Sequence, residues 1–172
     1  MTIAMQPIYT QTVGSGGVAS VTFNNIPQTY TDLAVQISSR STSGYGAGNP
    51  SLAMKFIYNG DTSETLYSST YELSTGTGRY TGAAWAGWFN SSNSTSNTFG
   101  SLFGYLPNYT GATFKSVITD NALEDTGSTG LYYGIQAQLY RSTSAITSMK
   151  FVPELGNFAQ YSTFSLYGIT KG

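Results

Sequence analysis

Residues 131–140 read LYYGIQAQLY, and this stretch alternates strictly between two rows of side chains. The first row is largely apolar: Leu131, Tyr133, Ile135, Ala137 and Leu139. The second row contains the two glutamines: Tyr132, Gly134, Gln136, Gln138 and Tyr140. Because successive side chains of a strand point to opposite faces of a sheet, this period of two predicts a half-buried antiparallel strand.

The same alternation recurs along the chain, and no window carries the 3.6-residue stripe of an amphipathic helix. It is clear at 21–23, 33–37 and 52–58, and weaker at 3–13, 65–73, 80–89, 98–106, 113–119, 145–152 and 161–169. Turn-rich joints separate these stretches at 14–17, 41–50, 76–78, 90–97 and 125–130. The pattern predicts a single all-β domain over 1–172, a two-sheet antiparallel β-sandwich of jelly-roll type.

The edges of such a sandwich have little of the usual protection in this sequence. Edge strands are commonly guarded by Lys, Glu or Pro, because bare N–H and C=O rows recruit other chains. Few such residues occur here, so we expect the edges to be covered by the chain's own loops and amino-terminal segment or by partners, the alternative being that twist, glycine and the long loops suffice. Glycines at 14–17 make residues 1–17 a candidate amino-terminal arm, and self-association as a homotrimer is expected.

Composition excludes several classes of function. Charged residues make up 9% of the chain, against about 25% in a typical globular domain. With neither His nor Cys, the chain offers no imidazole base, no Ser-His or Cys-His pair and no ordinary zinc site. We therefore expect no enzyme, no catalytic residue, no cofactor and no metal. The seven scattered cations and the net charge of −1 also argue against nucleic acid, and no apolar run is long enough to cross a membrane.

One acidic segment, Asp120 to Asp125, is the remaining candidate for carboxylate chemistry. Two carboxyls on one loop do not flank a glycosidic bond, and the spacing matches no EF-hand. The favoured interpretation is a solvated turn whose acids cap backbone amides, with a cation site as the alternative.

Trp85 and Trp88 are the only tryptophans. Three residues apart on a strand, they are predicted to face opposite sides, so that at most one serves the core. The other is a second core layer, an interface anchor or a platform for a sugar. The candidate interface residues are Tyr45, Tyr80, Trp85, Trp88 and Phe89.

Several motifs are more specific than composition. They are VTFNNIPQTYTDL at 21–33, FIYNGDT at 56–62, TFGS at 98–101 with LPNYT at 106–110, and AITS at 145–148 with GNFAQYST at 156–163 and LYGI at 166–169. In this order they resemble a group of tailed-phage virion proteins, over nearly the whole chain. Ile26-Pro27 and Leu106-Pro107 also have the character of framework turns, because proline fixes φ and extends the residue before it.

The resemblance implies a structural component of the phage particle. The expected role is a capsid decoration, or cement, protein that is made in the host cytoplasm and binds the outer capsid surface, with the major capsid protein as partner. The alternative is a tail-fibre or head-fibre module that binds host glycan. The middle of the chain, from Tyr71 to Asn97, departs from the shared motifs, and a partner-specific surface is expected there.

Overall fold

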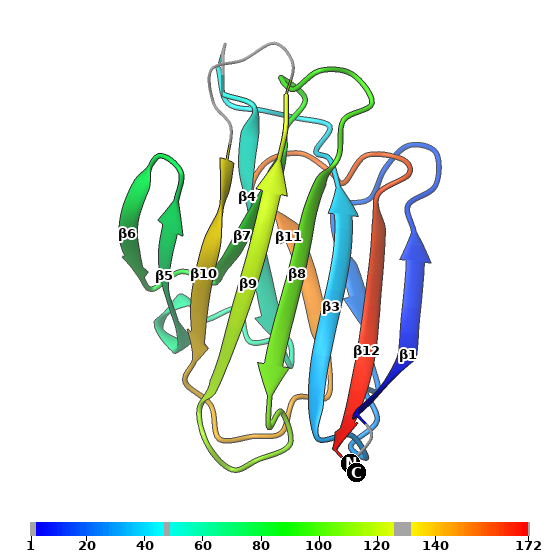
Figure 1. Ribbon diagram of the computed structural model, residues 1–172, viewed down its shortest axis with the longest axis vertical. Helices are drawn as coiled ribbons and strands as arrows, with labels where there is room; N and C mark the ends of the chain where they lie inside the picture. The colour runs from blue at the N-terminus through cyan, green and yellow to red at the C-terminus, as the bar shows by residue number, and fades with distance from the viewer. Residues whose placement is uncertain (1–2, 47–48, 126–131, 172) are drawn as a thin grey trace.

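The computed structural model describes residues 3–46, 49–125 and 132–171, which form two antiparallel sheets packed face to face (Figure 1). The larger sheet has the order β1-β12-β3-β8-β9-β10-β5-β6, and the smaller has the order β2-β11-β4-β7. The strands are β1 (Ile3–Thr12), β2 (Val21–Phe23), β3 (Asp32–Ser39), β4 (Ser51–Tyr58), β5 (Tyr67–Leu73), β6 (Gly76–Thr81), β7 (Trp85–Asn90), β8 (Gly100–Pro107), β9 (Lys115–Leu123), β10 (Tyr132–Tyr140), β11 (Met149–Pro153) and β12 (Thr163–Lys171), with one short 3₁₀ turn, η1 (Glu64–Leu66). The predicted all-β sandwich is confirmed, and no helix among the described residues is long and apolar enough to cross a membrane.

The core between the sheets is built around aromatic side chains. The Phe151 ring lies at centroid distances of 4.9 Å from Phe56, 5.4 Å from Phe164 and 5.7 Å from Phe23. These four rings come from strands of both sheets, and all are buried. Offset and edge-on aromatic pairs add to the stabilisation that burial alone provides, so this cluster fastens one sheet to the other.

Strand β10 is half-buried, with its glutamine row facing inward. Gln136 and Gln138 are each 1% exposed, whereas Ile135 is 52% and Tyr133 65% exposed. The period of two therefore predicted the strand but did not identify its buried face. Burying an amide is unfavourable unless it is hydrogen-bonded, so the inward glutamines need partners in the opposite sheet.

Those partners are backbone groups at the open edge of β7. Strand β7 pairs with β4 on one side only, because it ends the smaller sheet. On its other side, Nε2 of Gln136 donates to the Trp85 carbonyl at 2.8 Å, and the Trp88 N–H donates to Oδ1 of Asn121 at 2.9 Å. Side chains of the larger sheet thus take the place of a neighbouring strand and cover this edge.

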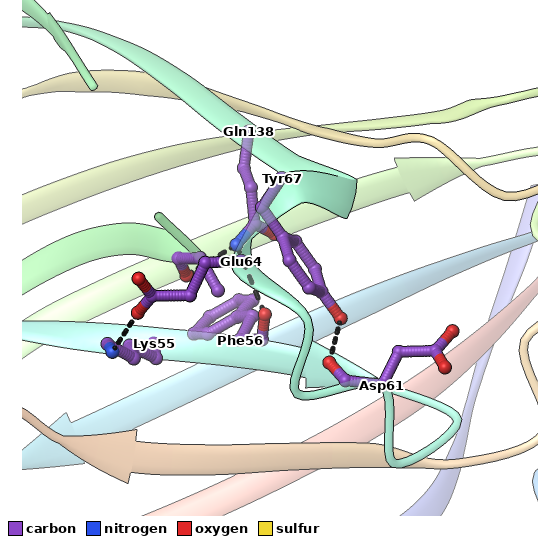
Figure 2. Close-up of polar contacts among 7 residues, drawn as sticks. Lys55, Phe56, Asp61, Glu64, Tyr67 and Gln138 are labelled. Atoms are coloured by element: carbon purple, nitrogen blue, oxygen red, sulfur yellow. Dashed lines mark hydrogen bonds and ion pairs between the residues drawn. The ribbon is translucent and has the colours of Figure 1, made fainter. Parts of the chain in front are cut away.

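Gln138 makes a similar bridge next to the start of β7 (Figure 2). Its Nε2 donates to the carbonyl of Phe56, at 3.1 Å, and to that of Ala84. Its Oε1 accepts the Tyr58 hydroxyl at 2.9 Å. One side-chain amide therefore satisfies three buried polar groups of the opposite layer.

The amino-terminal segment is docked in the sandwich. Strand β1 pairs with β12 from Ile3 opposite Lys171 to Thr12 opposite Thr163, at the edge of the larger sheet (Figure 1). Val13 follows and is buried. In the single chain, the candidate arm thus serves as an edge strand from residue 3 onward and covers β12.

The stretch 80–89, predicted as one strand, is divided between the two sheets. β6 ends at Thr81 and β7 begins at Trp85. Between them Gly82 has a φ of 75°, and its N–H donates to the Tyr67 carbonyl at 3.1 Å. Both flanking stretches are extended, so periodicity alone did not reveal that the chain changes sheets here.

Other predicted boundaries also shift. The turn expected at 76–78 lies at 74–75, which makes residues 76–81 the second strand of a hairpin. The strand expected over 145–152 begins only at Met149, and the one expected to end at 119 continues to Leu123. In the last case residues 120 to 123 stay paired with β10, so the acidic segment is mostly strand and not a turn.

The turn motifs meet at one end of the sandwich. Oδ1 of Asn59 accepts the Thr147 N–H at 2.8 Å, and the Thr147 carbonyl accepts the Ile26 N–H at 2.9 Å. The Tyr109 hydroxyl donates to the carbonyl of Pro27. Hydrogen bonds therefore connect the IPQTY, NGD, PNYT and AITS motifs to one another, as expected of framework turns.

Three buried tyrosines pack together beside Asp61. The Tyr140 ring lies 5.2 Å from those of Tyr58 and Tyr67, and the Tyr67 hydroxyl donates to the Asp61 carbonyl at 2.9 Å (Figure 2). Burial raises the pKa of each of the three phenols, because it disfavours the charged phenolate.

We predict that replacing Gln138 with leucine destabilises the fold by about 3 kcal/mol, because two carbonyls and a hydroxyl lose their buried partner. The matched control is Ile135→Thr, which changes an outward-facing residue of the same strand and should alter stability by less than about 0.5 kcal/mol. Urea denaturation measures both. Equal losses for the two variants would contradict the bridging role of Gln138.

We predict that stability falls under alkaline conditions. The three tyrosines have folded-state pKa values above the unfolded value of about 10, so the folded chain retains protons that the unfolded chain releases. Their contribution is complete below about pH 10 and is lost as the pH rises through the raised values. Unfolding free energies measured from about pH 8 to pH 11 test this, and Tyr140→Phe should flatten the decline.

Candidate functional site

An aromatic cleft opens beside the hairpin of β5 and β6, where this hairpin passes the ends of β4 and β7. Its volume is about 380 Å³. Five aromatic residues line it: Tyr45, Tyr71, Tyr80, Trp85 and Trp88. We call this the aromatic cleft.

Tyr71 is the centre of its aromatic wall. Its ring stacks on Tyr80 at a centroid distance of 5.3 Å and meets Trp88 edge-on at 5.0 Å. Trp88 is buried against Ala53 and Leu123, so it anchors this wall to the sandwich. Tyr80 lies at the exposed rim. The wall is therefore rigid at its base and accessible at its top.

The two tryptophans lie in this same cleft, which corrects the prediction that they face opposite sides. Met54 pairs with Gly87 and Lys55 pairs with Trp85, so β7 has one residue more than β4 at this point. A bulge of one residue reverses the alternation beyond it. Trp85 and Trp88 consequently point the same way although they are three residues apart.

Lys55 holds the outer side of Trp85. Its Nζ lies 4.7 Å from the centroid of the Trp85 ring and 2.9 Å from Oε1 of Glu64 (Figure 2 shows the ion pair). The Lys55 ammonium thus interacts with both the Trp85 ring and the Glu64 carboxylate, and Lys55 does not line the cleft. Among the described residues that line the cleft, Glu154 is the charged one.

Glu154 is fixed at the cleft by the backbone next to it. Its N–H donates to the Ala53 carbonyl at 3.0 Å, and its Oε2 accepts the Ala53 N–H at 3.2 Å. Burial, then a side-chain hydrogen bond with Glu154, then the charge of Glu154 raise the pKa of Tyr45 to about 12. The carboxylate and the Tyr45 hydroxyl therefore act as a coupled polar pair at the mouth.

Four of the five candidate interface residues are brought together in this cleft: Tyr45, Tyr80, Trp85 and Trp88. Phe89 is not among them. It is fully buried in the main core, 5.7 Å from the Phe158 ring, so it cannot meet a partner at the surface. It points inward because it follows Trp88 directly on the strand.

Sequence reasoning missed Tyr71 and Glu154. Tyr71 pairs across the hairpin with Gly78, and a Cβ on Gly78 would lie 2.4 Å from the Tyr71 hydroxyl. A glycine opposite an aromatic residue in a hairpin was the available signal. No sequence signal identified Glu154, because its position in the cleft depends on the pairing of β11 with β4, which local sequence does not specify.

The acidic segment does not assemble a site. Asp120 lies on β9 and faces outward, whereas Asp125 is buried and its Oδ1 accepts the Thr95 N–H at 2.7 Å. The cap predicted for these acids is thus present at Asp125. Among the described residues, no group of three potential metal-ligating side chains comes together.

We predict that Glu154→Gln lowers the pKa of Tyr45 from about 12 toward the ordinary tyrosine value. The variant removes the negative charge that opposes phenolate formation, while burial still holds the pKa above that of a free phenol. NMR titration of the tyrosine ring carbons measures the change. Glu124→Gln, at an exposed acid elsewhere, is the control, and an equal shift in both variants would contradict the pairing.

Comparison with known proteins identifies no relative of this chain. A scan against protein-family models and searches of curated proteins and of solved structures find no match to the chain.

Proposed function

We propose that the protein is a non-enzymatic structural protein of a phage virion that decorates the outer surface of the capsid. Its partner in this role is the major capsid protein, whose neighbouring subunits it clamps together. The ordered motifs, which resemble tailed-phage virion proteins, point to the particle. The observation that carries the proposal is an exposed apolar surface on the larger sheet.

This surface, the outer apolar face, consists of Phe103 on β8, Ile118 on β9, and Tyr133 and Ile135 on β10. Phe103 is 46% exposed and Ile118 50%, and the two β10 residues are more exposed still. Phe103 and Ile135 lie in one cross-strand row on either side of Asp120, and Ile118 and Tyr133 belong to the rows next to it, so the three adjacent strands present a mainly apolar face. Monomeric proteins seldom leave such a patch uncovered unless it has a partner.

One charge lies in the middle of this face. Asp120 pairs with Phe103 on one side and with Ile135 on the other. A matching surface on a capsid subunit would be apolar with one cation placed opposite Asp120. Such a partner gains specificity from the charge and most of its binding energy from apolar burial.

The scarcity of charge suits a permanent position on a shell. Apolar and hydrogen-bonded contacts are screened little by salt, so attachment should survive moderate ionic strength. Assembly as a homotrimer belongs to the same proposal, because several weak faces engaged at once bind more strongly than one.

The alternative role, a fibre module that binds host glycan, would use the aromatic cleft instead of the outer apolar face. The number of copies per particle separates the two roles. Decoration requires a copy number comparable to that of capsid subunits, whereas a fibre contributes only a few chains.

We predict that the double variant Ile118→Thr and Ile135→Thr binds particles lacking the native protein at least tenfold more weakly than the unaltered chain. Each substitution removes apolar area worth about 1 kcal/mol when covered and keeps a β-branched residue on its strand. Co-sedimentation with the particles measures binding. The control is Tyr161→Ser, at an exposed residue on the turn before β12. Equal binding by all three chains, or release of the unaltered chain by moderate salt, would refute docking through this face.

A further inference from the structure

We propose that the aromatic cleft is a binding site for a neutral saccharide, formed by the aromatic wall together with the Glu154 carboxylate. This inference does not rest on the capsid role, because it uses different residues. The outer apolar face lies on β8, β9 and β10, whereas the cleft is lined by β4, the β5–β6 hairpin, β7, the residue after β11, and Tyr45 and Asn49 before β4.

The aromatic wall suits the apolar face of a pyranose ring. Such a ring presents a flat array of C–H groups on one side, and tyrosine and tryptophan offer large surfaces at a low cost in conformational entropy. Tyr71 is already clamped between Tyr80 and Trp88. Binding therefore does not have to order this wall first, which favours affinity.

The polar groups suit the hydroxyl edge of the same ring. A carboxylate has about four acceptor positions, and the Glu154 carboxylate accepts the Ala53 N–H and raises the pKa of the nearby Tyr45 hydroxyl. Because its backbone is also tied to Ala53, its direction is set before a ligand arrives. The hydroxyls of Thr75 and Thr77, which also line the cleft, add groups that both donate and accept.

The charge of the cleft selects against acidic ligands. Glu154 would repel a uronic acid, a sialic acid or a phosphate, and Lys55 is engaged by Glu64 and Trp85 outside the wall. A small quaternary cation would also match aromatic rings and a carboxylate, but it would make no use of the threonine hydroxyls. A neutral sugar uses both the rings and the polar groups.

The arrangement is suited to binding and not to cleavage. Hydrolysis of a glycosidic bond ordinarily requires two carboxyl groups on opposite sides of the bond. The described lining of the cleft supplies one, from Glu154. The volume of about 380 Å³ lies within the range of small-molecule sites, which suits one or two sugar rings.

The test titrates the whole chain with methyl glycosides of glucose, galactose, mannose and N-acetylglucosamine while tryptophan emission is recorded. Trp85 and Trp88 are the only tryptophans and both line the cleft, so the emission reports on this site. We expect a saturable change with at least one neutral glycoside. Choline chloride, titrated in parallel, probes the quaternary-cation alternative.

Two variants assign the binding to the cleft. Tyr80→Ala removes an exposed rim residue of β6, and Glu154→Gln removes the charge but keeps an acceptor. Each should weaken glycoside binding about tenfold, the scale of one lost stacking or charge-assisted contact. Tyr133→Ala is the control at an exposed tyrosine of the outer apolar face and should bind the glycoside as the unaltered chain does.

Three results would overturn the inference: no saturable change with any glycoside, a response to choline alone, or unchanged affinity in both cleft variants. Circular dichroism of each variant establishes that it is folded, and Tyr45→Phe provides a further variant that removes one hydroxyl. The Ile118→Thr and Ile135→Thr double variant should keep its glycoside affinity. Failure of capsid docking and failure of saccharide binding are thereby separable.

Discussion

The rest of the structure depends on hydrogen bonds between side chains of the larger sheet and the backbone edge of β7. Thr119 and Asn121 on β9, and Gln136 and Gln138 on β10, turn their polar groups inward to reach that edge and the carbonyls beside it. An uncovered edge would recruit another chain, and buried amides without partners would destabilise the core. The inward amides cover the edge of β7, and the backbone groups there and beside it are the hydrogen-bond partners that the amides need. A chain with few charges thus covers this edge with its own side chains.

The same interaction has two effects on the surface. Since the polar rows of β9 and β10 face inward, the apolar residues Ile118 and Ile135 must face outward, because adjacent positions on a strand alternate. In addition, β7 is held against the larger sheet, where its bulge turns Trp85 and Trp88 toward the β5–β6 hairpin. The outer apolar face and the aromatic cleft thus both follow from the way side chains of the larger sheet form hydrogen bonds with the edge of β7.

The fold class and most strands could be predicted from the sequence, because extended backbone imposes a local period of two. The buried face of β10 could not, since it depends on what the opposite sheet needs and not on hydrophobicity. The sequence identifies both tryptophans as candidates but does not predict that they point the same way. Their common direction comes from a bulge on β7, between the partners of Met54 and Lys55. Glu154 reaches the cleft through its contact with Ala53, about a hundred residues earlier in the chain. The sequence around Glu154 does not predict so distant a partner.

The pairing of β1 with β12 constrains when this edge of the larger sheet can form. Strand β1 is made well before β12, so this ladder forms only after β12 has also been made. Until then β1 has a bare edge, and the β12 of another copy carries the same sequence as its own. Expression level and temperature would therefore govern how many chains close on themselves and how many exchange their first strand with a neighbour.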